Sequence, residues 1–455
     1  MAQFKNSMDL CKGHLFKQIV VYSMPLLGMM LLQLSFNLAD LVIVGRYSEN
    51  GAESVGAIGS TISLAHLVQN LFLGLSIGTN ILAANFFGAK KITQLRRLSY
   101  TAITVSMICG LFLASVGQLF IEPLLRLMET NTLAESTLYL RIYFLAMPAY
   151  MINVFGSTLL SATGDTKRPL YFLIYSGIFN VVLNYILVVF FGLGVAGVAW
   201  ATFASLAVAA ILVIRALMQH DGVYKFKFKF LSIDFKLLKR MLMLGIPASI
   251  QSNSFSFSNV LIQSAVNGLG PAAQAGNAIA YSFEGVVFTG SSVYCQTSVA
   301  FVAQNEGGGQ RQRTIRSIKY CLLIGFIITS IMGAIFTIWA REFCFIYDSN
   351  VTDDIVREAL GRIWVTLPLY GICSCMEVFI GSLRGLGSTL SSMVIMLVSV
   401  CLVRILWVLF VFPLYNNIPM LIACYPVTWS SCAIISLIYL IYKLKKTRNK
   451  CVDFT

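Results

Sequence analysis

Asp40 is the residue whose type and position most clearly indicate chemistry, because it is a carboxylate inside an otherwise apolar run, residues 16–45. A charge at the centre of a bilayer costs about 3 kcal/mol on insertion scales, so an acid there is rare unless it has a function. The structural alternative is an acid near a helix end that reaches the headgroups, since Arg46 is close in sequence. We interpret Asp40 as a functional acid that takes up a proton or a small cation.

Three neutral, oxygen-bearing residues are expected at a similar depth in the membrane. Asn180 and Asn184 are separated by one helical turn and share a helix face, and Thr202 lies on the next apolar run. At 1.5 Å rise per residue, these three and Asp40 fall within roughly 10 Å in depth. Such a set can ligate a small hard cation or surround one titrating acid with hydrogen bonds. The sequence therefore predicts a coupling site for H+ or Na+, although the asparagines could instead only link helices.

The second half of the chain carries intramembrane charges of its own and one polar span. Glu284 and Glu377 each interrupt an apolar run, and each either lines a cavity or belongs to buried, hydrogen-bonded structure. The stretch Ser249–Ile262 is rich in Ser, Asn and Gln, so it faces a wet cavity or forms a polar seam between helices. The residues considered as cavity lining are Asn37, Gln251, Asn253, Asn259, Glu284 and Glu377.

Two prolines, Pro25 and Pro247, lie at matching places in two expected helices. Proline removes a backbone donor and clashes with the preceding turn, so it kinks or loosens a helix. We interpret both as hinges, and we hypothesise that protonation or ion binding at Asp40 biases the bend.

The elements that must hold these residues are transmembrane helices. Of 455 residues, 57% are hydrophobic and 11% are charged, with a mean hydropathy of +0.79, which excludes a water-soluble domain. Long apolar runs recur along the chain, as in an all-α polytopic membrane protein, whereas a transmembrane β-barrel would show short alternating segments. The 11 cysteines show no paired CxxC spacing, so no disulfide framework or metal site is supported. No hydrolase or metalloprotease motif is found, so we expect neither an enzyme nor a cofactor.

Twelve spans are expected. They lie near residues 16–45, 54–84, 97–120, 136–161, 169–191, 194–218, 238–265, 272–303, 316–339, 357–383, 389–413 and 420–442. If both termini are cytoplasmic, most Lys and Arg fall on the inner side, which fixes the orientation in the cell (inner) membrane. The net charge of +14 then reflects topology, so nucleic acid is not expected as a partner.

An internal repeat of about 220 residues relates the two halves. The matching pairs are Met24–Asn37 with Ile246–Asn259, Ala83–Arg97 with Val302–Arg316, Arg141–Tyr150 with Arg362–Tyr370, and Ser161–Thr166 with Leu383–Thr389. The repeat predicts two six-helix bundles related by a pseudo-two-fold axis along the membrane normal, which suits alternating access. The expected boundaries are an N-terminal bundle over residues 1–218, a cytoplasmic linker over 219–237, a C-terminal bundle over 238–442 and a basic cytoplasmic tail over 443–455.

Motifs in both halves carry a resemblance to a known family. They are Pro25, "ADLVIVG" (Ala39–Gly45), "FFGAK" (Phe86–Lys90), "SATGDTKRP" (Ser161–Pro169), "NVVLNYILVVFFGLGVAGVAWAT" (Asn180–Thr202) and "GSLRGLGST" (Gly381–Thr389). Over essentially its whole length the chain resembles the multidrug and toxic compound extrusion (MATE) transporters. The resemblance implies a secondary antiporter that exports amphiphilic, often cationic organic compounds while H+ or Na+ moves inward. It also implies that the coupling site lies in the first half, where Asp40, Asn180 and Thr202 match the family motif.

The chain departs from the family pattern at Asn184, where many bacterial and archaeal relatives carry a second acid. Asp40 is thus left as the one acid of the first-half site, which can carry one proton or neutralise one Na+. The resemblance also puts carboxylates on the seventh and tenth helices of some relatives. Here the seventh helix has none, and Glu377 cannot be aligned with the tenth-helix acid.

A flippase and a channel are the alternative interpretations of the same sequence. A flippase for a lipid-linked or oligosaccharide precursor would belong to the wider superfamily, but more spans or a strongly basic central cavity would be expected. A channel would need a repeated filter-like segment. We therefore expect an antiporter that acts as a monomer in the lipid bilayer, with small amphiphilic molecules and a coupling cation as its partners.

Overall fold

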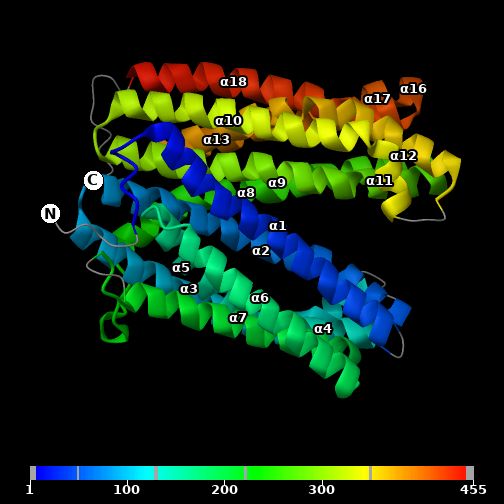
Figure 1. The fold of residues 1–455 in the computed structure, drawn as a ribbon, viewed down its shortest axis with the longest axis horizontal. Coiled ribbons are helices and arrows are strands. Elements are labelled where there is room, and N and C mark those ends of the chain that lie inside the picture. Colours follow the sequence, from blue (N-terminus) through cyan, green and yellow to red (C-terminus); the bar gives the residue numbers. More distant parts are fainter. Residues whose placement is uncertain (1–6, 49–50, 128–131, 220–222, 348–350, 447–455) are drawn as a thin grey trace. The chain divides into compact units, whose positions relative to one another are not determined.

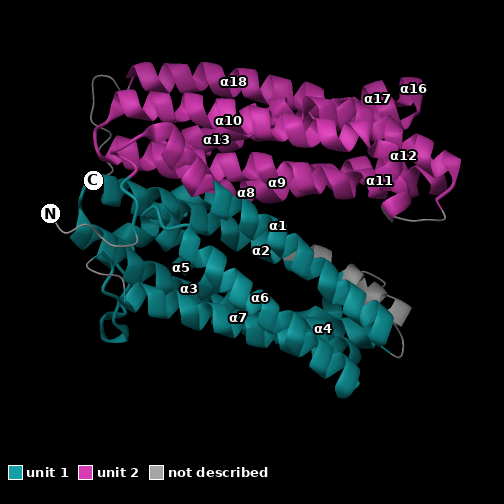
Figure 2. Cartoon of the chain, viewed as in Figure 1, with its two compact units in different colours: residues 1–9, 24–246 teal, residues 10–23, 247–455 magenta. Residues whose placement is uncertain are grey.

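The computed structural model describes residues 7–48, 51–127, 132–219, 223–347 and 351–446, and the described residues form helices without any strand (Figure 1). By their packing they divide into two compact units, shown in separate colours in Figure 2. Unit 1 comprises Met1–Asp9 and Met24–Ile246, and unit 2 comprises Leu10–Ser23 and Pro247–Thr455. The prediction of an all-helical fold is confirmed.

The first six expected spans appear as seven long helices and one π-helical turn. They are α1 (Leu15–Tyr47), α2 (Gly51–Gly88), α3 (Ile92–Leu127), α4 (Leu133–Leu145), α5 (Met147–Ala162), α6 (Lys167–Tyr185), η1 (Ile186–Phe190) and α7 (Gly194–Gln219). A single 3-10 turn, η2 (Phe228–Phe230), lies between α7 and the next long helix.

The last six spans are more often broken. Their elements are α8 (Phe235–Asn267), α9 (Pro271–Gly307), α10 (Arg311–Ile338), α11 (Ala340–Tyr347), α12 (Asp353–Thr366), η3 (Leu367–Leu369), α13 (Tyr370–Gly385), α14 (Thr389–Met396), η4 (Leu397–Leu402), α15 (Val403–Leu406), η5 (Trp407–Val411), α16 (Phe412–Tyr415), α17 (Ile418–Ile422) and α18 (Cys424–Lys446).

Length and composition make these helices membrane spans. Ten helical stretches among the described residues are long and apolar enough to cross a membrane, and α4 with α5 adds an eleventh if the pair, bent by 49°, counts as one span. The helix at the seventh expected position, α8, is 33 residues long but carries a polar middle, "QSNSFSFSN". Its polarity requires hydrogen-bond partners away from lipid.

Matched prolines break the fourth span of each half. Pro148 is the second residue of α5, directly after the bend, and Pro368 lies in the 3-10 turn η3 between α12 and α13. Glycines on the preceding span allow close approach at both breaks. A Cβ on Gly110 would collide with the Pro148 backbone, and one on Gly333 would collide with the Leu367 carbonyl. The repeat seen in the sequence therefore extends to the proline at which each fourth span is broken and to the glycine that packs against the break.

The two units also repeat their internal packing. In unit 1, α5 packs against α2, α3 and α7, which are the second, third and sixth spans of that half. In unit 2, α13 packs against α9, α10 and α18, which occupy the same places in order. The fourth span is thus the central helix of each bundle.

The division between the units falls inside α1 and α8 rather than in a loop. The start of α1 belongs to unit 2, whereas the rest of this helix, from Met24 onward, belongs to unit 1; conversely, α8 changes from unit 1 to unit 2 at Pro247. The segment just before α1 is fixed within unit 2 by Arg313, which donates hydrogen bonds to the carbonyls of Leu10, Lys12 and Gly13. Both predicted hinge prolines, Pro25 and Pro247, therefore lie where a helix passes from one unit to the other.

Candidate functional site

Asp40 lies in unit 1, in contact with Asn184, which in turn contacts Asn180. Asn184 Nδ2 on α6 donates to Asp40 Oδ1 on α1 at 2.5 Å, and the same nitrogen lies 3.3 Å from Asn180 Oδ1. Asn184 is fully buried and Asn180 is 6% exposed, whereas Asp40 is partly exposed. The helix face shared by the two asparagines is therefore turned toward the acid.

Local packing explains why α1 and α6 meet at this level. Near Asn180, Gly177 lies against the ring of Phe36, and a Cβ on Gly177 would overlap that ring. Beyond Asp40, Ile43 and Val44 of α1 pack with Val188 in a buried apolar cluster. The π-helical turn η1 begins two residues after Asn184, and such turns are frequent at functional sites.

One acceptor of the cluster is left over. Asn184 Oδ1 is buried and has no hydrogen-bond partner among the described residues. A buried carbonyl oxygen without a partner loses the free energy of its hydration, so such atoms are few in native proteins. Chemically, this oxygen can accept a hydrogen bond from a protonated group or ligate a small cation beside the Asp40 carboxylate.

The surroundings of Asp40 differ from the prediction at two residues, Thr202 and Tyr139. Thr202 is half-buried on α7, and no side-chain hydrogen bond joins it to Asp40, Asn180 or Asn184. Tyr139 on α4 lies near Asp40, and the Tyr139 ring stacks on that of Tyr143 with 6.0 Å between the ring centroids. Sequence reasoning missed Tyr139, because an aromatic residue in an apolar run is also typical of a helix core.

In unit 2, Glu284 is held by a buried ion pair. Arg362 donates from Nε to Glu284 Oε1 at 2.8 Å and from Nη2 to Oε2 at 2.6 Å, while the Thr366 hydroxyl donates to Oε1 at 2.6 Å. The two charged side chains are only 2% and 4% exposed. Both carboxylate oxygens thus have partners, as in a structural ion pair, and the role of Glu284 in a cavity lining stays a prediction.

The ion pair continues into an amide chain that reaches α8. Arg362 Nη1 donates to Asn277 Oδ1 at 2.5 Å, Asn277 donates to Gln263 Oε1 at 2.9 Å, and Gln263 donates to Asn267 Oδ1 at 2.9 Å. The guanidinium also lies over the ring of Tyr425, 5.2 Å from its centroid. Arg362 and Tyr425 lie on helices other than that of Glu284, so no local pattern could have joined them to it, whereas Asn277 lies two turns before Glu284 on α9.

The predicted polar residues of α8 find partners inside unit 2. Gln251 is buried and accepts from Arg384 Nη2 at 2.7 Å, and Asn259 accepts from Arg404 Nη1 at 2.8 Å. Asn253 is half-buried and donates to the Ser249 carbonyl of its own helix. These contacts satisfy part of the polar surface that α8 presents.

The remaining predicted residues lie apart from these networks. Glu377 is buried on α13, near the Cys295 thiol and the Arg384 guanidinium. Asn37 is exposed on α1. Pro25 and Pro247 are buried inside α1 and α8.

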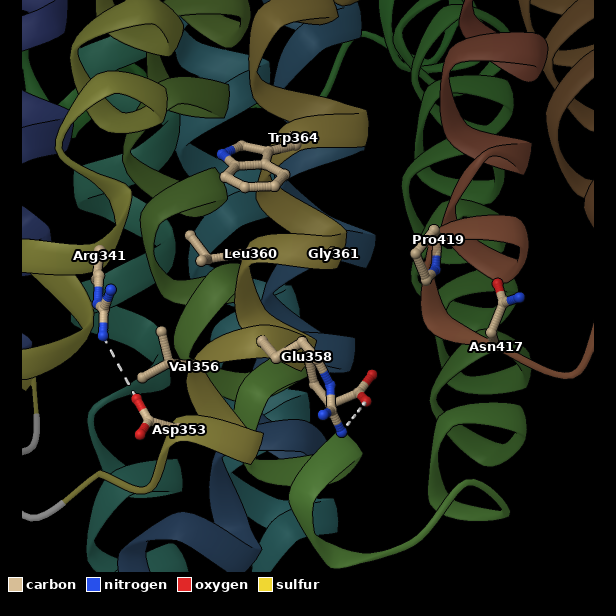
Figure 3. A pocket seen from close by; sticks show the side chains of 10 residues that line it. Arg341, Asp353, Val356, Glu358, Leu360, Gly361, Trp364, Asn417 and Pro419 are labelled. Carbon is tan, nitrogen blue, oxygen red and sulfur yellow. Dashed lines mark hydrogen bonds and ion pairs between the residues drawn. The ribbon is translucent and has the colours of Figure 1, made fainter.

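A pocket of about 610 Å³ lies in unit 2 beside α12 (Figure 3). Its lining residues are Arg341, Asp353, Val356, Arg357, Glu358, Leu360, Gly361, Trp364, Asn417 and Pro419. None of the residues predicted from the sequence lines it. Its charges are matched, because Arg341 pairs with Asp353 and Arg357 pairs with Glu358.

These features define a polytopic membrane protein of two internally repeated helical bundles, with an acid–amide cluster in one and a buried ionic network in the other. A family model described as MatE matches residues 25–186 and 247–409, which is more than half of the chain. The chain therefore belongs to the MatE family of multidrug efflux transporters, as its motifs predicted. The two matched ranges are the two halves of the internal repeat.

Relatives and solved structures agree with this membership. The chain is 28% identical over 393 residues to the probable multidrug resistance protein YoeA of Bacillus subtilis (strain 168), covering 83% of each protein. It is 24% identical over 390 residues to an FAD transporter of Shewanella oneidensis strain MR-1, covering 82% of this chain and 83% of that one. An outward-facing MATE transporter shares the fold with a TM-score of 0.90 at 19% identity, over 99% of this chain and 100% of that one.

Proposed function

We propose that this MATE transporter is a cation-coupled antiporter, which exports amphiphilic organic compounds, cationic ones in particular, in exchange for H+ or Na+. The observation that carries the proposal is the hydrogen bond from Asn184 to Asp40, in a cluster where Asn184 also donates to Asn180 and keeps a buried amide oxygen without a partner among the described residues. A carboxylate in a membrane span is costly, so its presence there indicates a function, and exchange of a cation is the function that this cluster suits.

The hydrogen-bond pattern suggests how Asp40 registers the cation. With Asp40 ionised, the Asn184 amide nitrogen donates to it. With Asp40 protonated, the acid becomes a donor and needs an acceptor, which a turned Asn184 amide supplies through Oδ1. Na+ would use the same oxygen as a ligand together with the Asp40 carboxylate and Asn180 Oδ1. In either case the cation changes the link between α1 and α6.

Coupling follows if that link biases the bend of α1. We propose that the prolines Pro25 and Pro247 absorb the bend, so that the site alternates between the two sides of the membrane. The orientation proposed is that of a monomer in the cell (inner) membrane with both termini in the cytoplasm, and Thr202 joins the coupling site in another state of the cycle. Export then draws on the cation gradient without an enzymatic step.

The test is ethidium efflux from inverted vesicles or proteoliposomes that contain the full chain, with an imposed pH or Na+ gradient. We expect one of the two gradients to drive efflux, and Asp40→Asn to lower gradient-driven efflux at least about tenfold, because the amide cannot exchange a charge. Asp353→Asn is the matched control, since Asp353 is an exposed acid that pairs with Arg341 across 3.4 Å. Efflux that neither gradient drives, or that Asp40→Asn leaves unchanged, would overturn the proposal.

A further inference from the structure

Arg404 on α15 is a fully buried guanidinium in unit 2 without an anionic partner among the described residues. Its Nη1 donates to Ser258 Oγ at 3.0 Å and to Asn259 Oδ1 at 2.8 Å. Its Nε and Nη2 are buried and have no hydrogen-bond partner, and no ion pair in the described part of the chain includes it. In a guanidinium, Nε–H and the neighbouring Nη2–H point in the same direction and form a two-pronged donor edge.

The same bundle shows what such an edge binds. Arg362 uses Nη1 for an amide oxygen, that of Asn277, and its Nε–Nη2 edge for the two oxygens of the Glu284 carboxylate. Arg404 likewise uses Nη1 for an amide oxygen, that of Asn259. The two guanidiniums even share a ring, because Arg404 lies 4.1 Å and Arg362 5.2 Å from the centroid of Tyr425. They differ in one respect, which is that no side chain of the described ranges supplies a carboxylate to the Arg404 edge.

The charges around Tyr425 are correspondingly unbalanced. Arg362 and Arg404 bring two positive charges to this ring, and Glu284 is the carboxylate bound to one of them. The faces of Tyr425 and of Phe255, the latter 5.0 Å away, stabilise the Arg404 cation in part. Ring faces do not satisfy N–H donors, however, and a buried donor without an acceptor is destabilising.

We propose that the Nε–Nη2 edge of Arg404 binds a carboxylate that a ligand supplies. The planar edge matches two carboxylate oxygens and would complete the arrangement that Arg362 shows with Glu284. The carboxylate comes either from an exported amphiphile or from a small free acid. In the first case the proposal builds on the proposed export function and names the group that holds the carboxylate of such a cargo.

A path to Arg404 is offered by α8, the span with the polar middle. Two side chains that touch the guanidinium, Phe255 and Asn259, are on α8 and only half-buried. Between them in sequence, Ser256 and Phe257 are exposed. A ligand would therefore approach the guanidinium along this polar helix.

The experiment measures equilibrium binding to the purified full chain without any gradient. The probes are norfloxacin, which carries a carboxylate and an amine, and norfloxacin methyl ester, which keeps the amine but lacks the anionic group. We expect the ester to bind at least about tenfold more weakly than the acid, the loss typical of one charge-assisted contact. A parallel series compares the melting temperature in sodium acetate with that in sodium chloride at equal ionic strength.

Arg404→Lys is the decisive variant, because lysine keeps the charge but not the two-pronged edge. We expect Arg404→Lys to abolish the preference for acid over ester, or the acetate effect, meaning a higher melting temperature in acetate than in chloride. We also expect it to lower the ratio of norfloxacin to ethidium export. Asn259→Ala, which removes the acceptor that holds Nη1, should weaken the same preference if the lysine variant does not fold. Arg126→Gln is the matched control, since this arginine of unit 1 is exposed and pairs with Glu122.

The outcomes separate the sources of the carboxylate and the two proposals. An acid-over-ester preference that depends on Arg404 identifies a cargo carboxylate, and an acetate effect that depends on Arg404 identifies a small free acid. If wild type shows neither effect, or if either persists in Arg404→Lys, the carboxylate site is overturned. Gradient-driven ethidium efflux in the wild type would then still stand, so a failure here is distinct from a failure of the antiport mechanism.

Discussion

Asn184 donates a hydrogen bond of 2.5 Å to Asp40 and thereby joins α6 to α1 within unit 1. The two residues are 144 positions apart, and the bond lies at the level where Gly177 lets the two helices approach closely. Because Asn184 has a carbonyl oxygen to spare, the pair can change its donor and acceptor roles when Asp40 changes its charge.

Asn184→Ala should change the binding of the coupling cation while leaving Asp40 in place. It should weaken Na+ binding, because a ligand oxygen is lost, but strengthen H+ binding, because the donor that stabilises the ionised carboxylate is lost. A hydrogen bond to a charged group contributes about 1.5 to 3 kcal/mol, so the half-saturating cation concentration for ethidium efflux should shift by roughly 10- to 100-fold, upward for Na+ and downward for H+. The control is Asn153→Ala, which removes an asparagine of α5 that accepts from Ser157. An unchanged half-saturating concentration in Asn184→Ala would remove Asn184 from the coupling site.

Thr202→Val should have a much smaller effect than Asn184→Ala. The Thr202 side chain makes no hydrogen bond to the acid or to either asparagine, so its loss should change cation dependence by about twofold or less. The same efflux titration measures it. An effect as large as that of Asn184→Ala would mean that Thr202 enters the site in a state other than the one described.

Breaking the Arg362–Glu284 pair should destabilise unit 2. Removing one partner of a buried pair leaves an uncompensated charge and costs about 3 to 5 kcal/mol, so Glu284→Gln and Arg362→Gln should each lower the melting temperature in detergent. The double change Glu284→Leu with Arg362→Met should recover much of the loss, because no charge is left alone. If the double variant is as unstable as the sum of the singles, the pair does not act as a unit.

Pro25→Ala and Pro247→Ala should each slow turnover, because both prolines lie where a helix passes from one compact unit to the other. Alanine restores the backbone donor and stiffens the helix at that point. The measurement is the initial rate of ethidium efflux at saturating cation. Pro123→Ala, at a proline inside α3 and within unit 1 alone, is the control. Unchanged rates in both hinge variants would sink the hinge hypothesis.

Arg313→Gln should loosen the attachment of residues 10–18 to the rest of unit 2. Arg313 binds three carbonyls between Leu10 and Gly13 and also Gln18 Oε1, at 2.6 Å. Hydrogen exchange over residues 10–18 should therefore become faster in the variant. Arg316→Gln, which removes an exposed arginine of the same helix, should leave the exchange as it is. Equal protection in both variants would show that other contacts hold the segment.

The fold class, the six spans of each half and the internal repeat could all be predicted from the order of the amino acids. Apolar runs of membrane length leave the backbone no alternative to helix, because lipid offers it no hydrogen-bond partner. The repeat was readable because matched prolines and glycines recur at one spacing, and Pro148 and Pro368 break the fourth span in both halves. The grouping of Asp40 with Asn180 and Asn184 was also predicted, since a helical period places the two asparagines on one face.

Which polar groups meet is a matter of tertiary packing. Arg362 of α12 binds Glu284 of α9 and lies over Tyr425 of α18, and no spacing along the chain encodes such contacts. The switch of α1 and α8 between units near Pro25 and Pro247 is likewise a property of packing. The unpartnered edge of Arg404 is of the same kind, because a sequence shows that a charge is present but not whether another side chain comes close enough to satisfy it.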